Sequence, residues 1–561
     1  MNVSSGTKLK QEFSSNYKSF DGPSELNDDC PTNGFTCDSN KNSEAFQLNE
    51  LTSGSSDLLD QSSSKLKETD EDRCGRDHPV HVYAFSIILA VGVTIALVLE
   101  NHLDATLVSI KGVVSDHELC TVLSEKVLRD GGSSVDAAIA GTLCLGVVHP
   151  HVSGVGGGGV MLIHKIRQNE TRVINFQGSA PNGLREEMLQ NASEIKAGLL
   201  VGVPGMLMGL HHAHSLYGRF SWENVVSRAA AVAREGFNVS QSLAAAISQV
   251  EGEQLVGRFR DLFIPNGQPL SPGSYLRMPG VAEVLQAGLF SFYHGNVSQE
   301  LEDEVRANGG VLSSEDLRNY SAEVQQPLEG LYNEFIIQVP SLPSVGAALI
   351  AALNLLESLH LGENNVTENK TYHWINEALT TALSMAHGLG DPEYSSSVSE
   401  LLSVMISKNH TEVLRQKMDF QSSDYNSTVY SPLTELLTSQ IVVMGPDDLV
   451  VSVASSLNRP FGSRIVTRSG VILNSLVVDF FWPNQSRGQP LTNKKNRVEP
   501  GKRPLSFLMP SMIVPAWSRC GTYMALSSSG GPNRLSEITQ MLDSVLFHHK
   551  QRNDSLSWRG R

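Results

Sequence analysis

The apolar and polar positions of the 561-residue chain divide it into three stretches. Residues 1–78 are rich in Ser, Asn, Asp, Glu and Lys and contain few large apolar side chains. Such a segment cannot bury enough surface to offset the loss of chain entropy, so we expect a disordered tail. Residues 79–99 form one apolar run, and from residue 100 onward helical and strand patterns alternate. This last stretch is long enough for several domains, but its evenly spread apolar residues equally permit one large folded unit.

The apolar run at 79–99 contains no Asp, Glu, Lys or Arg. About twenty such residues suffice to cross a bilayer as a helix, whereas a buried core helix is less consistent with a disordered neighbour. A cleaved signal peptide is disfavoured because 78 mostly polar residues precede the run. Arg73 and Arg76 precede it and Glu100 and Asp104 follow it, which favours a cytoplasmic amino terminus. The sequence therefore predicts a single-pass, type II membrane protein with its larger part extracellular or lumenal.

Asn-x-Ser/Thr sequences, the acceptors of N-linked glycans, are crowded after the apolar run. The tail contains only Asn2, and this distribution is typical of a lumenal or extracellular surface. The predicted glycosylation sites are Asn169, Asn191, Asn238, Asn296, Asn319, Asn365, Asn369, Asn409, Asn426, Asn484 and Asn553.

Charge and cysteine content restrict the class of protein further. A formal net charge of −16, without a dense Lys/Arg block, argues against nucleic acid as a partner. Three of the six cysteines, Cys120, Cys144 and Cys520, follow the apolar run. In an oxidising compartment two of these could form a disulfide, and buried free thiols are the alternative.

Residues 117–166 show a clear succession of elements. HELCTVLSEKVLRD predicts an amphipathic helix, VDAAIAGTLCLGV an Ala-rich helix and VMLIHKI a strand. The stretch 154–159 nominally contains G-x-G-x-x-G. It follows a helix and precedes a strand, the reverse of the order in dinucleotide-binding folds, so we reject a dinucleotide site. The glycines instead predict close approach of backbone segments near the active site.

The second half of the chain contains a candidate nucleophile. Residues 201–402 have a mostly helical pattern, and the polar, weakly periodic residues 405–435 predict a flexible linker. QIVVM, GPDD and LVVSVAS then predict a β-hairpin, with further strands around 470–481 and 511–527. If the peptide bond before Thr438 is cut, the freed α-amine could act as the base for the threonine hydroxyl. Taken alone, β-propensity is the better explanation of a threonine at this position.

Several ordered blocks favour the nucleophile. The blocks are DGGSSVDAAIA (130–140), HPHVSGVGGGG (149–159), GLLVGVPGM (198–206), SSLNRPFGS (455–463) and PGKRPLSF (500–507). In sequence and order they resemble the γ-glutamyltransferase family, also called glutathione hydrolases, over nearly everything after Lys111. The resemblance implies an α+β fold, the αββα sandwich of N-terminal-nucleophile hydrolases, and catalysis without a metal or organic cofactor.

The resemblance also implies how the chain matures and what it acts on. Self-cleavage before Thr438 would separate a large-subunit region at 100–437 from a small-subunit region at 438–561. The threonine would then form an ester with the γ-glutamyl group of glutathione or a conjugate. Water would resolve the ester to glutamate, and an amino acid or dipeptide would resolve it to a transfer product. The family's disulfide corresponds to Cys120 and Cys144.

The family's catalytic groups correspond to Thr438, Ser456, Gly530 and Gly531. Ser456 keeps a hydroxyl where a threonine is usual, and it could hydrogen-bond the nucleophile. The two glycines lie in SSSGGPNR and would supply backbone N–H groups that stabilise an oxyanion, at roughly 3 kcal/mol per donor.

The substrate-binding positions correspond to Asn458, Asp479, Ser506 and Gln177. Asn458 and Asp479 would hold the α-amino and α-carboxylate ends of the donor, with Asp479 as counter-charge to the ammonium, and Ser506 would contact the carboxylate. Gln177 stands where the family has an arginine, whose charged, bidentate grip a glutamine cannot reproduce. A lost charge-assisted hydrogen bond costs on the order of 1.5–3 kcal/mol, so donor affinity should fall tenfold or more.

Further departures from the family pattern leave three hypotheses. The family usually has a polar side chain where this chain has Leu476 or Phe507, and a histidine where it has Gln440. Only thirty residues follow Gly531, whereas family members continue further. Missing strands would leave a sheet edge open. The first hypothesis is a weakly active γ-glutamyl enzyme. The second is a catalytically impaired membrane glycoprotein of the same fold that acts as a binding partner. The third is an enzyme with a non-glutamyl donor that the apolar Leu476 and Phe507 accommodate.

Overall fold

The structure is a computed structural model, and it describes most of the chain after residue 111. The predicted tail and the predicted span at 79–99 lie outside the described residues. Within the described part, no helix combines the length and apolar character that a membrane crossing requires. The described residues are 112–190, 195–253, 255, 257–360, 368–421, 437–481, 493–516, 523–527 and 532–547.

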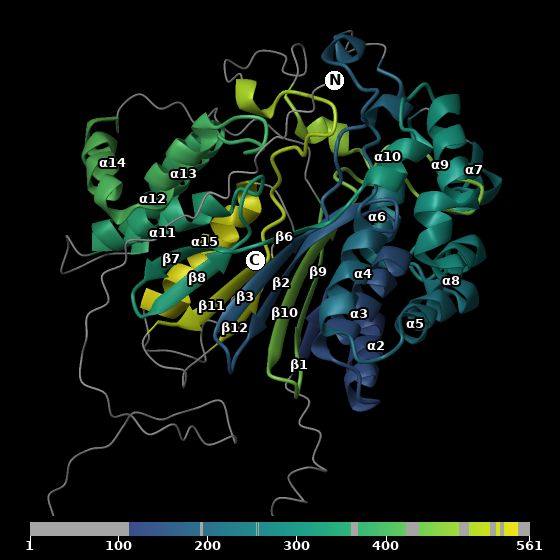
Figure 1. The fold of residues 1–561 in the computed structure, drawn as a ribbon, viewed down its shortest axis with the longest axis horizontal. Helices are drawn as coiled ribbons and strands as arrows, with labels where there is room; N and C mark the ends of the chain where they lie inside the picture. The colour runs from purple at the N-terminus through teal and green to yellow at the C-terminus, as the bar shows by residue number, and fades with distance from the viewer. Residues whose placement is uncertain are drawn as a thin grey trace, which may run out of the picture.

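Two antiparallel sheets form the centre of the described fold (Figure 1). The six-stranded sheet has the order β1-β9-β10-β2-β3-β6, and the four-stranded sheet has the order β12-β11-β8-β7. A short pair, β4 and β5, lies apart from both. The strands are β1 (Gly112–Ser115), β2 (Gly158–Lys165), β3 (Glu170–Asn175), β4 (Phe237–Asn238), β5 (Tyr275–Leu276), β6 (Glu323–Gln325), β7 (Leu328–Tyr332), β8 (Phe335–Val339), β9 (Ser439–Met444), β10 (Leu449–Ser456), β11 (Ser511–Pro515) and β12 (Met524–Leu526).

Helices cover the outer face of each sheet, so the layers run helix, sheet, sheet, helix (Figure 1). The helices beside the six-stranded sheet include α3, which packs directly on β9 and β10. Those on this side are α2 (Glu118–Arg129), α3 (Ser134–Val148), α4 (Met206–Tyr217), α5 (Trp222–Glu235), α6 (Gln241–Val250), α7 (Gly257–Phe263), α8 (Pro279–His294), α9 (Asn296–Ala307) and α10 (Ser314–Asn319). Those beside the four-stranded sheet are α11 (Gly346–His360), α12 (Glu368–Ala386), α13 (Ser397–Ile406), α14 (Lys408–Gln421) and α15 (Pro532–Phe547).

Helix α3 shows how sequence determines this layering. Its residues are apolar or small on every side, and all but Gly146 are buried, because it lies between the sheet and the other helices. A capping box begins it, since Ser133 and Asp136 each accept a backbone N–H of the other. The helix therefore forms at a defined start and fixes the position of the strands that pack on it.

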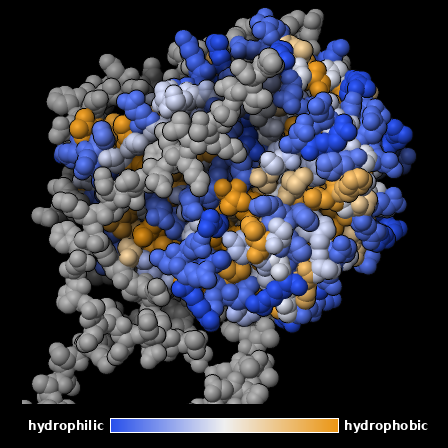
Figure 2. All heavy atoms as spheres, in the orientation of Figure 1, coloured by the Kyte–Doolittle hydropathy of each residue, from blue (hydrophilic) through white to orange (hydrophobic). Residues whose placement is uncertain are grey.

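The two sheets face one another across a small apolar core. Strand β10 contacts β12, and β2 contacts β11. Outside this interior, hydrophilic side chains cover most of the face seen in Figure 2, with smaller hydrophobic patches between them. The buried residues between the sheets are Val160, Leu162, Val173, Val450, Ala454, Leu508, Met512 and Val514.

The predicted hairpin forms as β9 and β10, with Asp448 in the left-handed region in its turn. Ser439 pairs with Ser455 at the open end of the hairpin. Thr438 and Ser456 are the next residues beyond this pair, so they are neighbours. Because β10 also pairs Ser456 with Gly158 of β2, the ends of three strands meet here. This end of the six-stranded sheet is where the candidate site lies.

Two sequence expectations were wrong in detail. Residues 408–421, expected to be part of a flexible linker, form helix α14. The region around 470–481 forms an isolated bridge between Val466 and Ile472 and the 3-10 helix η4 (Leu476–Asp479) rather than strands. The stretch 201–402 is mostly helical as predicted, and it also contains the short strands β4 to β8.

Candidate active site

A side-chain hydroxyl group donates a hydrogen bond to the carbonyl oxygen of the peptide bond before Thr438. Thr438 is buried and directly precedes β9, and Leu437 comes immediately before it in the chain. Ser456 Oγ donates to the Leu437 carbonyl oxygen at 2.5 Å and accepts from the Asn458 backbone N at 2.8 Å. A donor on that oxygen would stabilise the negative charge that develops there if the carbonyl carbon is attacked.

The loop after β10 is held in an uncommon backbone conformation. Asn458 and Phe461 have φ values of 75° and 58°, which side-chain-bearing residues adopt only when their surroundings enforce it. Leu457 N donates to Val152 O at 2.8 Å, and Phe461 N donates to His151 O at 2.9 Å. The SSLNRPFGS loop is therefore fixed against the HPHVSGVGGGG segment.

The glycines of that segment permit the contact, as the sequence predicts. A Cβ added at Gly157 would lie 2.3 Å from the Ser456 carbonyl oxygen, and one at Gly156 would lie 2.1 Å from the Ile472 carbonyl oxygen. Both distances are impossible for real side chains, so backbone approaches backbone here. The glycine-rich run supports the loop that carries Asn458.

Asn458 connects the cleavage position to a carboxyl group. Its Nδ2 donates to Asp479 Oδ2 at 2.7 Å, and Asp479 is half-buried at the end of η4. Burial raises the pKa of the Asp479 carboxyl to about 7, while the hydrogen bond from Asn458 and the charge of Arg459 act in the opposite direction. Leu476, at the start of η4, is buried and contributes no polar group.

Asn496, which the sequence analysis missed, joins this carboxyl segment to the PGKRPLSF block. Its Nδ2 donates to the Asp479 carbonyl oxygen at 2.7 Å, and its Oδ1 accepts from Leu505 N at 2.8 Å. The residue is the last of 3-10 turn η5 (Lys494–Asn496) and is buried. No local sequence pattern marks it, because its role depends on two segments distant in the chain.

Gln177 and Ser506 meet at the same segment. Gln177, just after β3, is buried and its Nε2 donates to the Pro504 carbonyl oxygen at 3.0 Å. Ser506 is buried too, and its Oγ accepts from Leu508 N at 3.1 Å. Tyr320 Oη donates to the Gln177 carbonyl oxygen at 2.8 Å. The glutamine therefore supports the strand-like segment that carries Ser506 and offers no charge.

The remaining predicted positions lie at the edge of the site or outside the residues that the structure describes. Gly530 and Gly531 lie outside the described residues. Phe507 is partly buried against the core of the four-stranded sheet. Gln440 donates its backbone N–H to Asp116 Oδ2 at 2.7 Å. Thr438, Ser456, Asn458 and Asp479 are thus joined through hydrogen bonds or the chain itself, and Asn496 joins the segment of Gln177 and Ser506 to them.

A row of histidines beside the loop is a second feature that sequence reasoning missed. The rings of His117 and His149 are 5.2 Å apart, those of His149 and His151 are 5.3 Å apart, and His151 lies 5.9 Å from Phe461. Burial lowers the pKa of His149 to about 4 and of His151 to about 3. These two rings are therefore neutral near pH 7 and serve as packing groups.

The structure places the predicted covalent sites as follows. Cys120 of α2 and Cys144 of α3 form a disulfide with a Cα–Cα distance of 5.5 Å. Asn369 lies on α12. The acceptors Asn191, Asn365, Asn426, Asn484 and Asn553 lie outside the described residues. The acceptors with exposed side chains are Asn169, Asn238, Asn296, Asn319 and Asn409.

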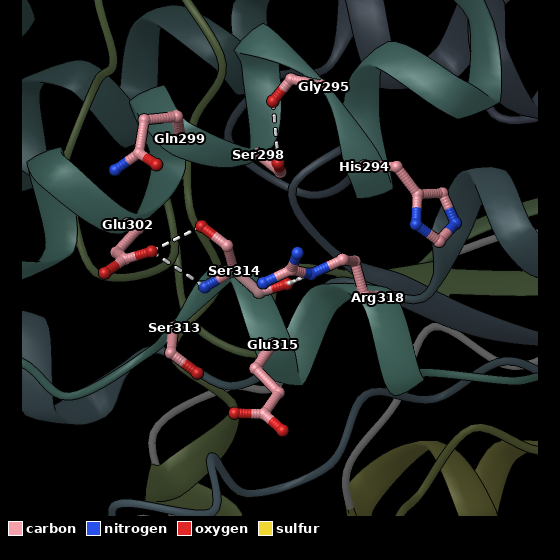
Figure 3. A pocket seen from close by; sticks show the side chains of 9 residues that line it. All are labelled: His294, Gly295, Ser298, Gln299, Glu302, Ser313, Ser314, Glu315 and Arg318. Atoms are coloured by element: carbon pink, nitrogen blue, oxygen red, sulfur yellow. Dashed lines mark hydrogen bonds between the residues drawn. The ribbon is translucent and has the colours of Figure 1, made fainter.

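A surface cleft among the described residues lies away from the predicted site residues. It has a volume of about 340 Å³ and lies between the start of α9 and α10 (Figure 3). Glu302, which lines it, accepts the backbone N–H of Ser314 at 2.9 Å and so caps α10. Among the described residues no group of three or more His, Cys, Asp or Glu could hold a metal ion.

The layering of helix, sheet, sheet and helix is the fold of the N-terminal-nucleophile hydrolases, and in this chain a hydroxyl residue stands at the head of β9. Residues 120–557 match the family model described as Gamma-glutamyltranspeptidase. The chain therefore belongs to the γ-glutamyltranspeptidase family.

Two individual relatives show how similar the chain is to known proteins. Glutathione hydrolase 7 of Homo sapiens is 44% identical over 534 residues, covering 92% of this chain and 80% of that protein. The long acidic tail, MGPDD and SSLNRPFGS predict a resemblance to this same subtype, gamma-glutamyltransferase 7, and the comparison confirms it. Glutathione hydrolase 2 of Arabidopsis thaliana is 30% identical and covers 78% of this chain and 77% of that protein.

Solved structures show the same fold. Helicobacter pylori γ-glutamyltranspeptidase matches with a TM-score of 0.51 and 25% identity, covering 59% of this chain and 99% of that chain. Cephalosporin acylase from Bacillus halodurans matches with a TM-score of 0.67 and 21% identity, covering 79% and 82% of the two chains. The second likeness concerns the fold alone.

Proposed function

We propose that this chain cuts itself before Thr438 and then uses the freed threonine to hydrolyse or transfer γ-glutamyl groups. Membership of the γ-glutamyltranspeptidase family supports the reaction class. The observation that carries the proposal is the Ser456 hydroxyl, 2.5 Å from the carbonyl oxygen of Leu437. This carbonyl oxygen belongs to the peptide bond whose cleavage would free the Thr438 amine.

In the maturation step Thr438 Oγ attacks the Leu437 carbonyl carbon, and its proton passes to the departing backbone nitrogen. The C–N bond breaks as the ester bond forms, and negative charge develops on the Leu437 oxygen beside Ser456. Water then hydrolyses the ester. This leaves a carboxylate on Leu437 and a free amine and hydroxyl on Thr438.

In turnover the same hydroxyl attacks the γ-carbonyl of a donor such as glutathione, with the Thr438 amine as base. The amine of the remaining peptide leaves with the transferred proton. Water resolves the γ-glutamyl ester to glutamate, or an amino acid or dipeptide takes the glutamyl group. Asp479 would hold the donor's ammonium as counter-charge, and Asn458, joined to it at 2.7 Å, would orient that carboxyl.

The proposal extends to the cell. The apolar run at 79–99 would anchor the chain as a type II membrane protein, and the glycan acceptors would then face the lumen or the extracellular space. The exposed side chains of Asn169, Asn238, Asn296, Asn319 and Asn409 support this orientation, because a glycan needs an accessible acceptor. Glycosidase treatment of the full-length protein in sealed microsomes, with and without protease, would test it.

The catalytic proposal is tested on full-length protein purified from membranes. We expect a fragment whose first residue is Thr438, and glutamate release from glutathione. Thr438→Ala should abolish both, and Thr438→Ser should retain cleavage because it keeps the hydroxyl. Ser439→Ala is the matched control, since it removes a buried neighbouring hydroxyl of β9 that lies outside the proposed chemistry.

Each outcome has a defined meaning. Thr438-dependent cleavage with Thr438-dependent glutamate release supports the proposal as a whole. A cleaved protein that releases no glutamate would refute turnover and favour a binding role for the same fold. A folded, glycosylated chain that stays uncut and inactive would refute both steps.

A further inference from the structure

Four partly buried arginines of this region have an Nε atom without a hydrogen-bond partner: Arg459, Arg464, Arg497 and Arg503. Arg464 pairs with Glu253, Arg497 with Glu186 and Arg503 with Glu323. Among the described residues, Arg459 alone of the four has no carboxylate in ion-pair contact. A partly desolvated guanidinium without a counter-ion is costly, and an incoming anion would relieve that cost.

The position of Arg459 is determined by the site loop. It follows Asn458, whose side chain holds Asp479, and its own backbone N donates to Ser475 Oγ at 3.3 Å. Because Arg459 directly follows the residue whose side chain bonds Asp479, the arginine and the carboxyl belong to the same corner of the loop, although they form no ion pair. The Arg459 charge also acts on the pKa of Asp479. A carboxyl and an uncompensated cation therefore share one corner of the site.

That combination fits an α-amino-acid group. Its ammonium and its carboxylate are attached to one carbon, so a site for it needs an anion and a cation close together. Asp479 supplies the anion, and guanidinium is suited to bidentate contact with a carboxylate. The nearby alternatives are already engaged, since Gln177 is neutral and donates to Pro504 O, and Lys502 pairs with Glu499.

We infer that Arg459 binds the α-carboxylate of the γ-glutamyl donor and so determines the specificity of the site for donors with a free α-carboxylate. The inference rests on the proposed function insofar as it takes the Asn458–Asp479 corner as the donor site. Arg459 thereby supplies the charge that is absent at Gln177.

Equilibrium binding to the full-length protein tests the inference without requiring turnover. The probes are L-glutamate and L-isoglutamine, which keeps the ammonium but carries an uncharged amide in place of the α-carboxylate. We expect wild-type protein to bind L-glutamate about ten- to a hundredfold more tightly than L-isoglutamine. Arg459→Leu should lose that preference through weaker glutamate binding and leave isoglutamine binding within about twofold, and Arg459→Lys should restore part of it.

Two controls separate binding from other effects. Arg464→Leu removes a partly buried arginine of the same loop region whose partner is Glu253, and it should leave the preference unchanged. Measurement at about pH 8.5 as well as pH 6 keeps Asp479 ionised in one condition, so an indirect effect of Arg459 on that carboxyl would appear only at the lower pH. Equal thermal unfolding of the variants establishes that they are folded.

The outcomes are distinct from those of the catalytic proposal. If Arg459→Leu keeps the wild-type preference at pH 8.5, or if wild-type protein shows no preference, the inference is wrong. If cleavage and glutamate release fail but the Arg459-dependent preference is present, the inference holds and the catalytic proposal fails. If release is normal and the preference does not depend on Arg459, the reverse applies.

Discussion

Replacing Ser456 by alanine removes one hydrogen bond from the carbonyl that self-cleavage would attack. Ser456 Oγ donates to the Leu437 oxygen at 2.5 Å, so its contribution grows as that oxygen becomes negative. Loss of one such donor typically slows a reaction by about 100- to 1,000-fold, or roughly 3–4 kcal/mol. The alanine also leaves the Asn458 N–H without its acceptor, at about 1–3 kcal/mol if water cannot replace it. We therefore expect self-cleavage of Ser456→Ala to be at least 100-fold slower.

The assay follows the full-length chain after a pulse of synthesis and measures the fraction cut over time on a denaturing gel. Ser456→Thr should stay within about threefold of wild type, because it keeps the hydroxyl. Ser455→Ala is the matched control on the same strand, since that side chain bonds Ser153 at 2.7 Å and not Leu437. Wild-type cleavage by a folded Ser456→Ala chain would refute the role that we assign to this contact.

Three further predictions follow from the charges and the covalent link. With a pKa of about 7, Asp479 takes up a proton below that pH, so donor KM should rise up to about tenfold per pH unit from pH 7 downward, and Asp479→Asn should remove this dependence. His149 and His151 have folded-state pKa values of about 4 and about 3, below the unfolded value of 6.5, so the unfolded chain binds more protons between these limits. The free energy of unfolding should thus fall as pH decreases from 6.5 to about 4, by at most about 1.4 kcal/mol per pH unit for each histidine. A urea midpoint that does not change with pH would contradict this, and so would a His151→Phe variant whose urea midpoint depends on pH as much as that of the wild type. Replacing Cys120 and Cys144 together by serine should lower the free energy of unfolding by about 3 kcal/mol, because the bridge closes a loop with a sequence separation of 24, and an unchanged urea midpoint would count against it.

Local pattern was sufficient where each element depends on its own residues. The Ala-rich sequence VDAAIAGTLCLGV predicts the helix that forms as α3, and QIVVM, GPDD and LVVSVAS predict the β9–β10 hairpin. Helix α14 was missed because its sequence is mostly polar and its stability comes from packing on α11. The apolar run at η4 suggested a strand, but Val477 and Val478 instead pack into a small core with Leu184.

The site itself could be predicted only in part, because family motifs name residues but not their partners. Gln177 illustrates the difference. From sequence it is only a lost arginine, whereas in the structure its amide donates to Pro504 O and supports the segment of Ser506. Asn496 has no motif at all, since it joins Asp479 to Leu505 by contacts between distant segments. Arg459 likewise becomes informative only when its missing counter-ion is seen.

Asn458 links the two activities that this fold would have to perform. Its backbone N–H bonds the Ser456 hydroxyl that polarises the Leu437 carbonyl, and its side chain bonds the Asp479 carboxyl that would hold the donor. Maturation would therefore depend on the backbone of the loop, in which Asn458 has a left-handed φ of 75°. Donor binding would depend on the side chains that the loop presents. Substitutions at Gln177 or Arg459 can accordingly change donor recognition while self-cleavage continues, because neither side chain touches the Leu437–Ser456 contact. A cleaved chain alone is consequently no evidence that the donor site works, and a measured donor preference is needed to establish it.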